Sequence, residues 1–116
     1  MKKFQFGDFE TEIDTTDVSF VERYEEAAER YDAAIKSLPK DGKASNQLKA
    51  ICQIFFDTFD SVFGEGTHEK MFGNRISVDL CTTAFVELVK MMRDYTETMN
   101  KIKSIQPNRA ARGAKK

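Results

Sequence analysis

The stretch "LKAICQIFFDTFDSVFG", residues 48–64, is the strongest helical signal in the chain. Its apolar residues recur at intervals of three and four: Leu48, Ile51, Cys52, Phe55, Phe56, Phe59, Val62 and Phe63. This spacing puts them in one wide stripe along an α-helix. Ser45 is a suitable N-cap, and Gly64 stands where a C-terminal cap is usual. Four phenylalanines on one helix predict the centre of a helical core rather than a ligand pocket.

The overlapping segment "FGEGTHEKMFGNR", residues 63–75, holds three of the six glycines and the only histidine, so it is the best candidate for chemistry. A phosphate loop needs GxxxxGK[ST] after a strand, whereas this segment follows a helix and places Glu65 where it would repel a phosphate. A metal site needs more ligands than His68 and the adjacent glutamates supply. We therefore expect no catalytic, cofactor-binding or metal site, and a solvent-exposed His68.

The same segment fits a corner between two helices. Thr67 is expected to cap a single turn over residues 68–72, and Gly73-Asn74 tolerates the left-handed φ that ends such a turn. Lys70 and Arg75 are expected on the surface. Four apolar side chains are expected to pin the corner to the core: Phe63, Met71, Phe72 and Ile76.

The segment after this corner is expected to form the longest helix, capped by Ser77. Its seam alternates between steps of three and four through Val78, Cys81, Phe85, Leu88, Met92, Tyr95, Met99 and Ile102. Such a helix extends for about 40 Å, longer than the other helices can cover. Two interpretations stay open for the methionines in its second half: they fill gaps in the bundle, or they form an exposed partner surface. Under the second interpretation, the candidate partner-binding residues of this helix are Met91, Met92, Tyr95 and Met99.

The chain before residue 48 supplies a first helix and a hairpin. The spacing from Val21 to Leu38 predicts a helix over 19–38, with Ser19 and Glu22 as a capping box and Pro39 ending it. Strict alternation in "KFQFGDFETEI", residues 3–13, predicts a β-hairpin around a two-residue Gly7-Asp8 turn.

This hairpin places Phe6 opposite Phe9 and Phe4 opposite Thr11, so one of its faces is apolar. Because an isolated hairpin is marginal in water, that face must lie on the helices or against a neighbouring subunit. Phe4, Phe6 and Phe9 are therefore candidate partner-binding residues.

Together these signals predict a mainly α fold: an N-terminal β-hairpin (1–14), a three-helix bundle with one additional short turn of helix, and a long C-terminal helix. The 116 residues suit a single domain, which we place at 1–104. Cys52 and Cys81 are expected to be buried free thiols. With no signal-peptide core and no spanning segment, the chain is expected in the cytoplasm and off the membrane.

Charge is distributed unevenly along the chain. Residues 101–116 carry six cations and no acid, so the net charge of −1 leaves −7 for residues 1–100. The acidic body disfavours nucleic acid as the main partner. Residues 105–116 are expected to form a flexible basic tail, because they contain too few apolar residues to fold alone.

The hairpin, "DVSFVERYEEA" at residues 17–27, the phenylalanine-rich helix ending in "FGEGTHEKMFGN" and the long final helix resemble the tail assembly chaperones of siphophages and prophages of Gram-positive bacteria. The resemblance covers roughly residues 4–100. It implies a non-enzymatic protein without a cofactor that binds the tape-measure protein, prevents its aggregation and recruits tail-tube subunits. It also implies self-association, the host cytoplasm and often a longer frameshifted product.

Two other functions compete with this one. A small acidic phage-encoded inhibitor of a host defence system would use the charge of the body to occupy a nucleic-acid groove. Its acids, however, are expected to be spread evenly over helix faces instead of clustered. An enzyme with a hidden helical site is the third possibility, and no set of nucleophile, base and oxyanion donor supports it.

Overall fold

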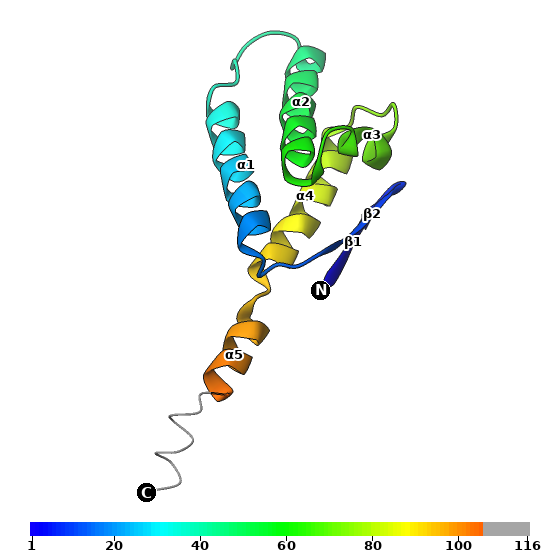
Figure 1. Ribbon diagram of the computed structural model, residues 1–116. Helices are drawn as coiled ribbons and strands as arrows, with labels where there is room; N and C mark the ends of the chain where they lie inside the picture. The colour runs from blue at the N-terminus through cyan, green and yellow to red at the C-terminus, as the bar shows by residue number, and fades with distance from the viewer. Residues whose placement is uncertain (106–116) are drawn as a thin grey trace, which may run out of the picture.

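The computed structural model describes residues 1–105 and is mainly helical (Figure 1). A hairpin of β1 (Lys2–Phe6) and β2 (Phe9–Ile13) precedes α1 (Val18–Lys36) and α2 (Ala44–Phe63). The short α3 (Thr67–Phe72) leads into α4 (Val78–Arg93) and α5 (Thr96–Ser104). The predicted fold class is therefore confirmed. All of the basic tail except Ile105 lies outside the described residues.

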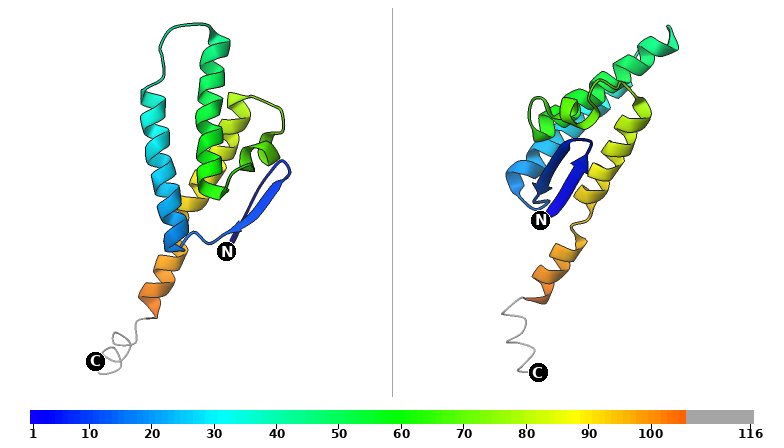
Figure 2. Two further views of the ribbon diagram at one scale, coloured as in Figure 1. Left: turned by 45° about the horizontal axis from the view of Figure 1, so that its top comes forward. Right: turned by 90° about the vertical axis from the view of Figure 1, so that its right-hand side faces the viewer.

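The helices α1 and α2 run antiparallel and side by side, and α4 crosses behind them (Figure 1). The hairpin and α3 lie together at the lower end of α2, and α5 continues away from the body beyond the end of α4 (Figure 2). The core contains side chains from both strands and from α1 to α4, and its largest fully buried members are Phe4, Phe59, Ile13, Leu88, Val62, Cys52 and Cys81. The hairpin thus packs on the helices of its own chain, the first of the two expected arrangements.

The hairpin has the predicted register, with Phe6 opposite Phe9 and Phe4 opposite Thr11. Gly7 has a φ of +59°, which the turn requires and which glycine adopts without strain. The turn also rests on α3, because the Asp8 N–H donates to the carbonyl of Lys70 at 2.9 Å. The hairpin is therefore fixed at its tip as well as along its apolar face.

The first helix begins earlier than the capping-box prediction. Its N-cap is Asp17, whose carboxylate accepts a hydrogen bond from the Phe20 N–H at 3.0 Å. Ser19 lies inside the first turn and donates its hydroxyl to Asp17 at 3.0 Å. A carboxylate is favoured at this position because it also meets the positive end of the helix dipole.

The second helix also begins before its predicted cap, since Ala44 is helical and Lys43 is its N-cap residue. Its end is as predicted: Gly64 is the C-cap, with a φ of 121°. Arg23 of α1 donates to the carbonyl of Val62 at 3.4 Å, which satisfies one of the last carbonyls of α2.

The corner after α2 is a short helix, as expected, but its details differ. Gly66 is its N-cap residue, and Thr67 lies buried in its first turn with its hydroxyl donating to the Gly64 carbonyl at 2.6 Å. Met71 and Phe72 are buried as predicted. Ile76 is 59% exposed, so it does not join them. Ile76 directly precedes Ser77, the N-cap of α4, and most of its side chain stays in contact with solvent.

The long C-terminal segment consists of two helices, because Asp94 and Tyr95 interrupt it. The seam predicted through them is therefore not one continuous helix. Aspartate, tyrosine and threonine follow one another at this point, and all three are weaker helix formers than alanine or leucine. Asp94 also pairs with Lys2 of β1, which holds the chain at the end of α4.

Candidate functional site

A groove of about 380 Å³ lies where α1 begins and α4 gives way to α5. We call it the basal groove. Its lining residues come from the loop after β2, from α1 and from the two C-terminal helices: Thr15, Thr16, Val21, Tyr24, Glu25, Met92, Tyr95 and Met99. Three of these, Met92, Tyr95 and Met99, belong to the predicted partner surface. The groove is mostly apolar, which suits the docking of an apolar side chain.

The predicted partner residues of the C-terminal segment fall into two groups. Tyr95 and Met99 are 52% and 42% exposed, in agreement with the expected exposed stripe. Met91 and Met92 are 9% and 8% exposed, so at these two positions the first of the two interpretations holds and the second, an exposed partner surface, does not. They fill the core because α4 packs against the other elements as far as its last turn, whereas α5 has left the bundle.

The second helix of this segment, α5, carries an apolar face that is open to solvent. Tyr95, Met99 and Ile102 follow one another at steps of four and three, so they lie on one side of the helix. Ile102 is 50% exposed, and Ile105 just beyond it is 71% exposed. Lys103 lies one turn after Met99 on the same side. This face extends the apolar lining of the groove along α5.

The α1 wall of the groove combines one acidic side chain with two largely apolar ones. Glu25 lines the groove, and Val21 and Tyr24 beside it are half-buried. Burial raises the pKa of the Tyr24 hydroxyl, with the nearby charge of Arg93 acting in the opposite direction. Tyr24 therefore presents a neutral ring and hydroxyl to the groove at neutral pH.

The loop that forms the other wall is held by local hydrogen bonds. Asp14 accepts from the Thr16 N–H at 3.0 Å and from the Thr16 hydroxyl at 2.6 Å. These two bonds lower the pKa of the Asp14 carboxyl. A neighbouring, more polar depression of about 290 Å³ shares this loop and includes Lys2 and Asp94, which form an ion pair. The polar depression thus borders the apolar groove on the hairpin side.

The predicted partner residues of the hairpin are occupied within the chain. Phe4 is 1% exposed and stacks on Phe63, with their ring centroids 5.2 Å apart. Phe9 contacts Phe63 at 5.1 Å, and Phe6 contacts Phe72 at 5.4 Å. Phe4 therefore serves the core and is not available to a partner, while Phe6 and Phe9 are half-buried against it.

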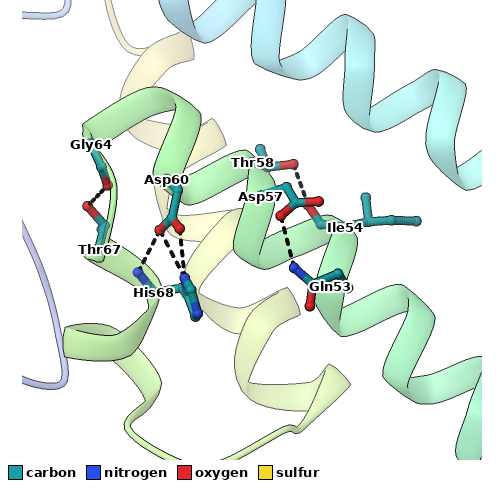
Figure 3. Close-up of polar contacts among 8 residues, drawn as sticks. All are labelled: Gln53, Ile54, Asp57, Thr58, Asp60, Gly64, Thr67 and His68. Carbon is teal, nitrogen blue, oxygen red and sulfur yellow. Dashed lines mark hydrogen bonds and ion pairs between the residues drawn. The ribbon is translucent and has the colours of Figure 1, made fainter.

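The only histidine forms a structural clasp (Figure 3). His68 Nδ1 lies 2.9 Å from Asp60 Oδ2, and the His68 N–H donates to Asp60 Oδ1 at 3.0 Å. Its ring stacks on Phe56, with centroids 4.5 Å apart and planes inclined by 17°. The expected solvent-exposed His68 is therefore corrected: it is partly buried and ties the start of α3 to α2. Within residues 1–105, no three His, Cys, Asp or Glu side chains gather to hold a metal.

The two cysteines are buried free thiols, as predicted. Cys52 lies on α2 and Cys81 on α4, and neither side chain is exposed to solvent. Burial, aided by the neighbouring thiol, raises the pKa of Cys81 to about 12, and burial also raises the pKa of Cys52. Neither thiol is a nucleophile under ordinary conditions, because the reactive species is the thiolate.

Five residues of the groove were not predicted as part of a partner surface: Thr15, Thr16, Val21, Tyr24 and Glu25. Val21 and Tyr24 belong to the predicted seam of the first helix. The two threonines lie in a loop without periodicity, and Glu25 lies on a helix face expected to be solvated. A break in the helical pattern near Asp94 would have been the signal, because the groove exists only where α4 ends.

A family model described as a family of unknown function, DUF6673, matches residues 7–116. No curated protein and no solved structure gives a significant match. Within the described residues, none of the helices is both long and apolar enough to cross a membrane.

Proposed function

The chain belongs to the DUF6673 family, whose function is unknown, and we propose that it is a non-enzymatic protein-binding protein, a tail assembly chaperone that holds the tape-measure protein and recruits tail-tube subunits. The observation that carries the proposal is the basal groove, which continues into the exposed apolar face of α5. Proteins rarely leave an apolar helix face next to an apolar groove uncovered, and such surfaces mark interaction sites.

The proposed mode of binding is a client helix laid against the groove. An amphipathic helix presents side chains at positions i, i+3, i+4 and i+7, and these enter an apolar groove in succession. Met99 suits this role because it is exposed and its flexible, polarisable thioether repacks around different side chains. A tape-measure protein is a long helical client that offers many such segments, and the resemblance to tail assembly chaperones supports this choice of client.

The size of the groove favours weak and reversible binding. It accommodates two or three apolar side chains, each worth about 1.5–3 kcal/mol when fully buried. Association costs at least about 4 kcal/mol in lost motional freedom. The small net free energy of binding suits a chaperone, which must release its client when the tail tube assembles around it.

The test is co-expression with the tape-measure protein of the same phage or prophage, followed by measurement of the soluble client and of its affinity. Met99→Asp places a charge on the apolar face, and we expect the affinity to fall by about tenfold or more. Asn100→Asp is the matched control, because it adds the same charge to the next residue of α5, which lies away from this face.

The two variants decide the proposal. Equal losses of client binding in Met99→Asp and Asn100→Asp would point to charge rather than to the apolar face. A client that stays insoluble with the unmodified chain would overturn the chaperone function. Circular dichroism of both variants establishes that the bundle is folded, which is expected because α5 lies outside it.

A further inference from the structure

The basal groove and the end of α5 are complementary to each other, yet they cannot meet within one chain. The groove is lined by the first part of the C-terminal face, Tyr95 and Met99, whereas Ile102 and Lys103 lie farther along α5 and are not among its lining residues. Ile102 is half exposed and does not line the groove. The helix α5 leads away from the body (Figure 2), and within residues 1–105 nothing covers more than about half of Ile102 near its end.

Charge is complementary in the same way. Glu25 stands at the wall of the groove, and Lys103 lies on the apolar side of α5. In the part of the chain that the structure describes, neither residue forms an ion pair. An occupant that fits both features is an amphipathic helix with an isoleucine beside a lysine, and α5 of a second copy is such a helix.

We propose that, when no client is bound, two copies of this chain pair through antiparallel α5 helices, each placing its Ile102 in the basal groove of the other. The inference rests on the proposed function in that the groove is taken to be the client site. The paired copy then occupies the same surface as the client, so pairing and client binding exclude each other.

A two-fold axis passing by Met99 gives this arrangement its register. Two antiparallel helices related by such an axis bring Met99 of each copy together, and a residue four positions after Met99 lies opposite one four positions before it. Lys103 of the partner subunit then lies beside Tyr95, on the side of the groove that Glu25 lines. Ile102 of the partner subunit lies one position closer to the axis, over the groove.

The pair is expected to be weak. A single short helix and a groove of this size form an interface at the low end of those seen in transient complexes. Weak pairing fits a regulatory role, because a client present at a higher local concentration displaces the second copy by mass action. It also shields the apolar face of α5 while the client is absent.

Sedimentation equilibrium of the full chain over a range of concentrations tests the pairing. Ile102→Asp is expected to weaken dimerisation about tenfold or more, and Asn100→Asp to leave it unchanged. Lys103→Glu and Glu25→Lys should each weaken the dimer, and the double variant should restore it, because the two charges are exchanged. A chain that stays monomeric up to sub-millimolar concentration, or a double variant that is not rescued, overturns the proposal.

A covalent readout tests the register separately. Met99→Cys places two thiols at the two-fold axis, and mild oxidation with a disulfide reagent is expected to join the two copies. Cys52 and Cys81 do not compete, because they are buried. Asn100→Cys, on the other side of the helix, is expected to cross-link far less, and equal cross-linking by both variants would contradict the register.

The two hypotheses fail in different ways. Sedimentation of the unmodified chain without client measures the pairing, and client binding measured at concentrations where the chain is monomeric measures the groove, so each is determined separately. A dimer that binds no client would leave the pairing standing and remove the proposed function. Client binding by a chain that never dimerises would leave the proposed function standing and remove the pairing. Client binding that leaves the dimer intact would contradict the proposal that pairing and client binding exclude each other.

Discussion

Gly7 is the residue at which the hairpin and the helical part of the chain come closest. A Cβ at this position would lie 2.2 Å from the carbonyl oxygen of Met71, and the φ of +59° disfavours any other residue. The neighbouring Asp8 N–H donates to the Lys70 carbonyl at 2.9 Å. One glycine thus permits both the turn of the hairpin and its docking on the end of α3.

Gly7→Ala is therefore expected to destabilise the protein by more than the cost of its backbone conformation. An L-residue at positive φ costs about 1–2 kcal/mol, and relieving the overlap with a backbone carbonyl adds about 1–3 kcal/mol. Gly66→Ala is the matched control, because Gly66 also has positive φ, 89°, but open space around it. Urea unfolding measures both, and equal losses would show that the contact with Met71 is not important.

At the scale of elements, one aromatic cluster joins the hairpin to two helices. Phe63 in the last turn of α2 lies 5.2 Å from Phe4, 5.1 Å from Phe9 and 6.0 Å from Phe20, measured between ring centroids. The strands, α1 and α2 therefore meet at a single side chain. Because an isolated two-stranded hairpin is marginal, its stability depends on this contact.

Phe63→Ala is expected to cost about 3 kcal/mol and to loosen the hairpin more than the helices. Hydrogen exchange should show the largest loss of protection in β1 and β2. Leu48→Ala near the start of the same helix is the control: Leu48 is 50% exposed, and its loss should cost less than about 1 kcal/mol. Unchanged protection of the strands in Phe63→Ala would mean that other contacts hold the hairpin.

At the scale of the whole molecule, the thiol pair sits between α2 and α4 at the centre of the bundle. The folded chain keeps Cys81 protonated up to a pKa of about 12, whereas the unfolded chain loses this proton near 9.0. Between these values the unfolded state binds fewer protons, so the stability of the fold falls as pH rises. Below about pH 9.0, the contribution of the Cys81 thiol to the free energy of unfolding is fully present.

Alkaline unfolding tests this coupling. We expect the free energy of unfolding to fall as the pH rises from about 9 toward about 12, and to fall less steeply in Cys81→Ala. Val62→Ala is the control, because it also removes buried atoms but leaves the thiols in place, and its slope should match that of the unmodified chain. Tyr24 and Tyr31, whose pKa values burial also raises, contribute equally to all three chains. An identical slope in Cys81→Ala would contradict the assignment.

Local patterns in the chain were sufficient for the hairpin, for the second helix and for part of the core. Alternation about Gly7 and Asp8 predicted the register of the hairpin, and the spacing of the phenylalanines predicted the buried face of α2. Gly64 was recognised as the end of that helix. These features depend on backbone geometry and on neighbours within a few residues, which sequence records directly.

The groove and the roles of several side chains depended on contacts between distant segments. Met92 is buried and Met99 is exposed because α4 packs into the bundle and α5 leads away from it, although both lie in one helical pattern. His68 is held by Asp60 because the corner folds back on α2. Which faces meet is settled by packing across the whole bundle, and a one-dimensional pattern does not contain that information.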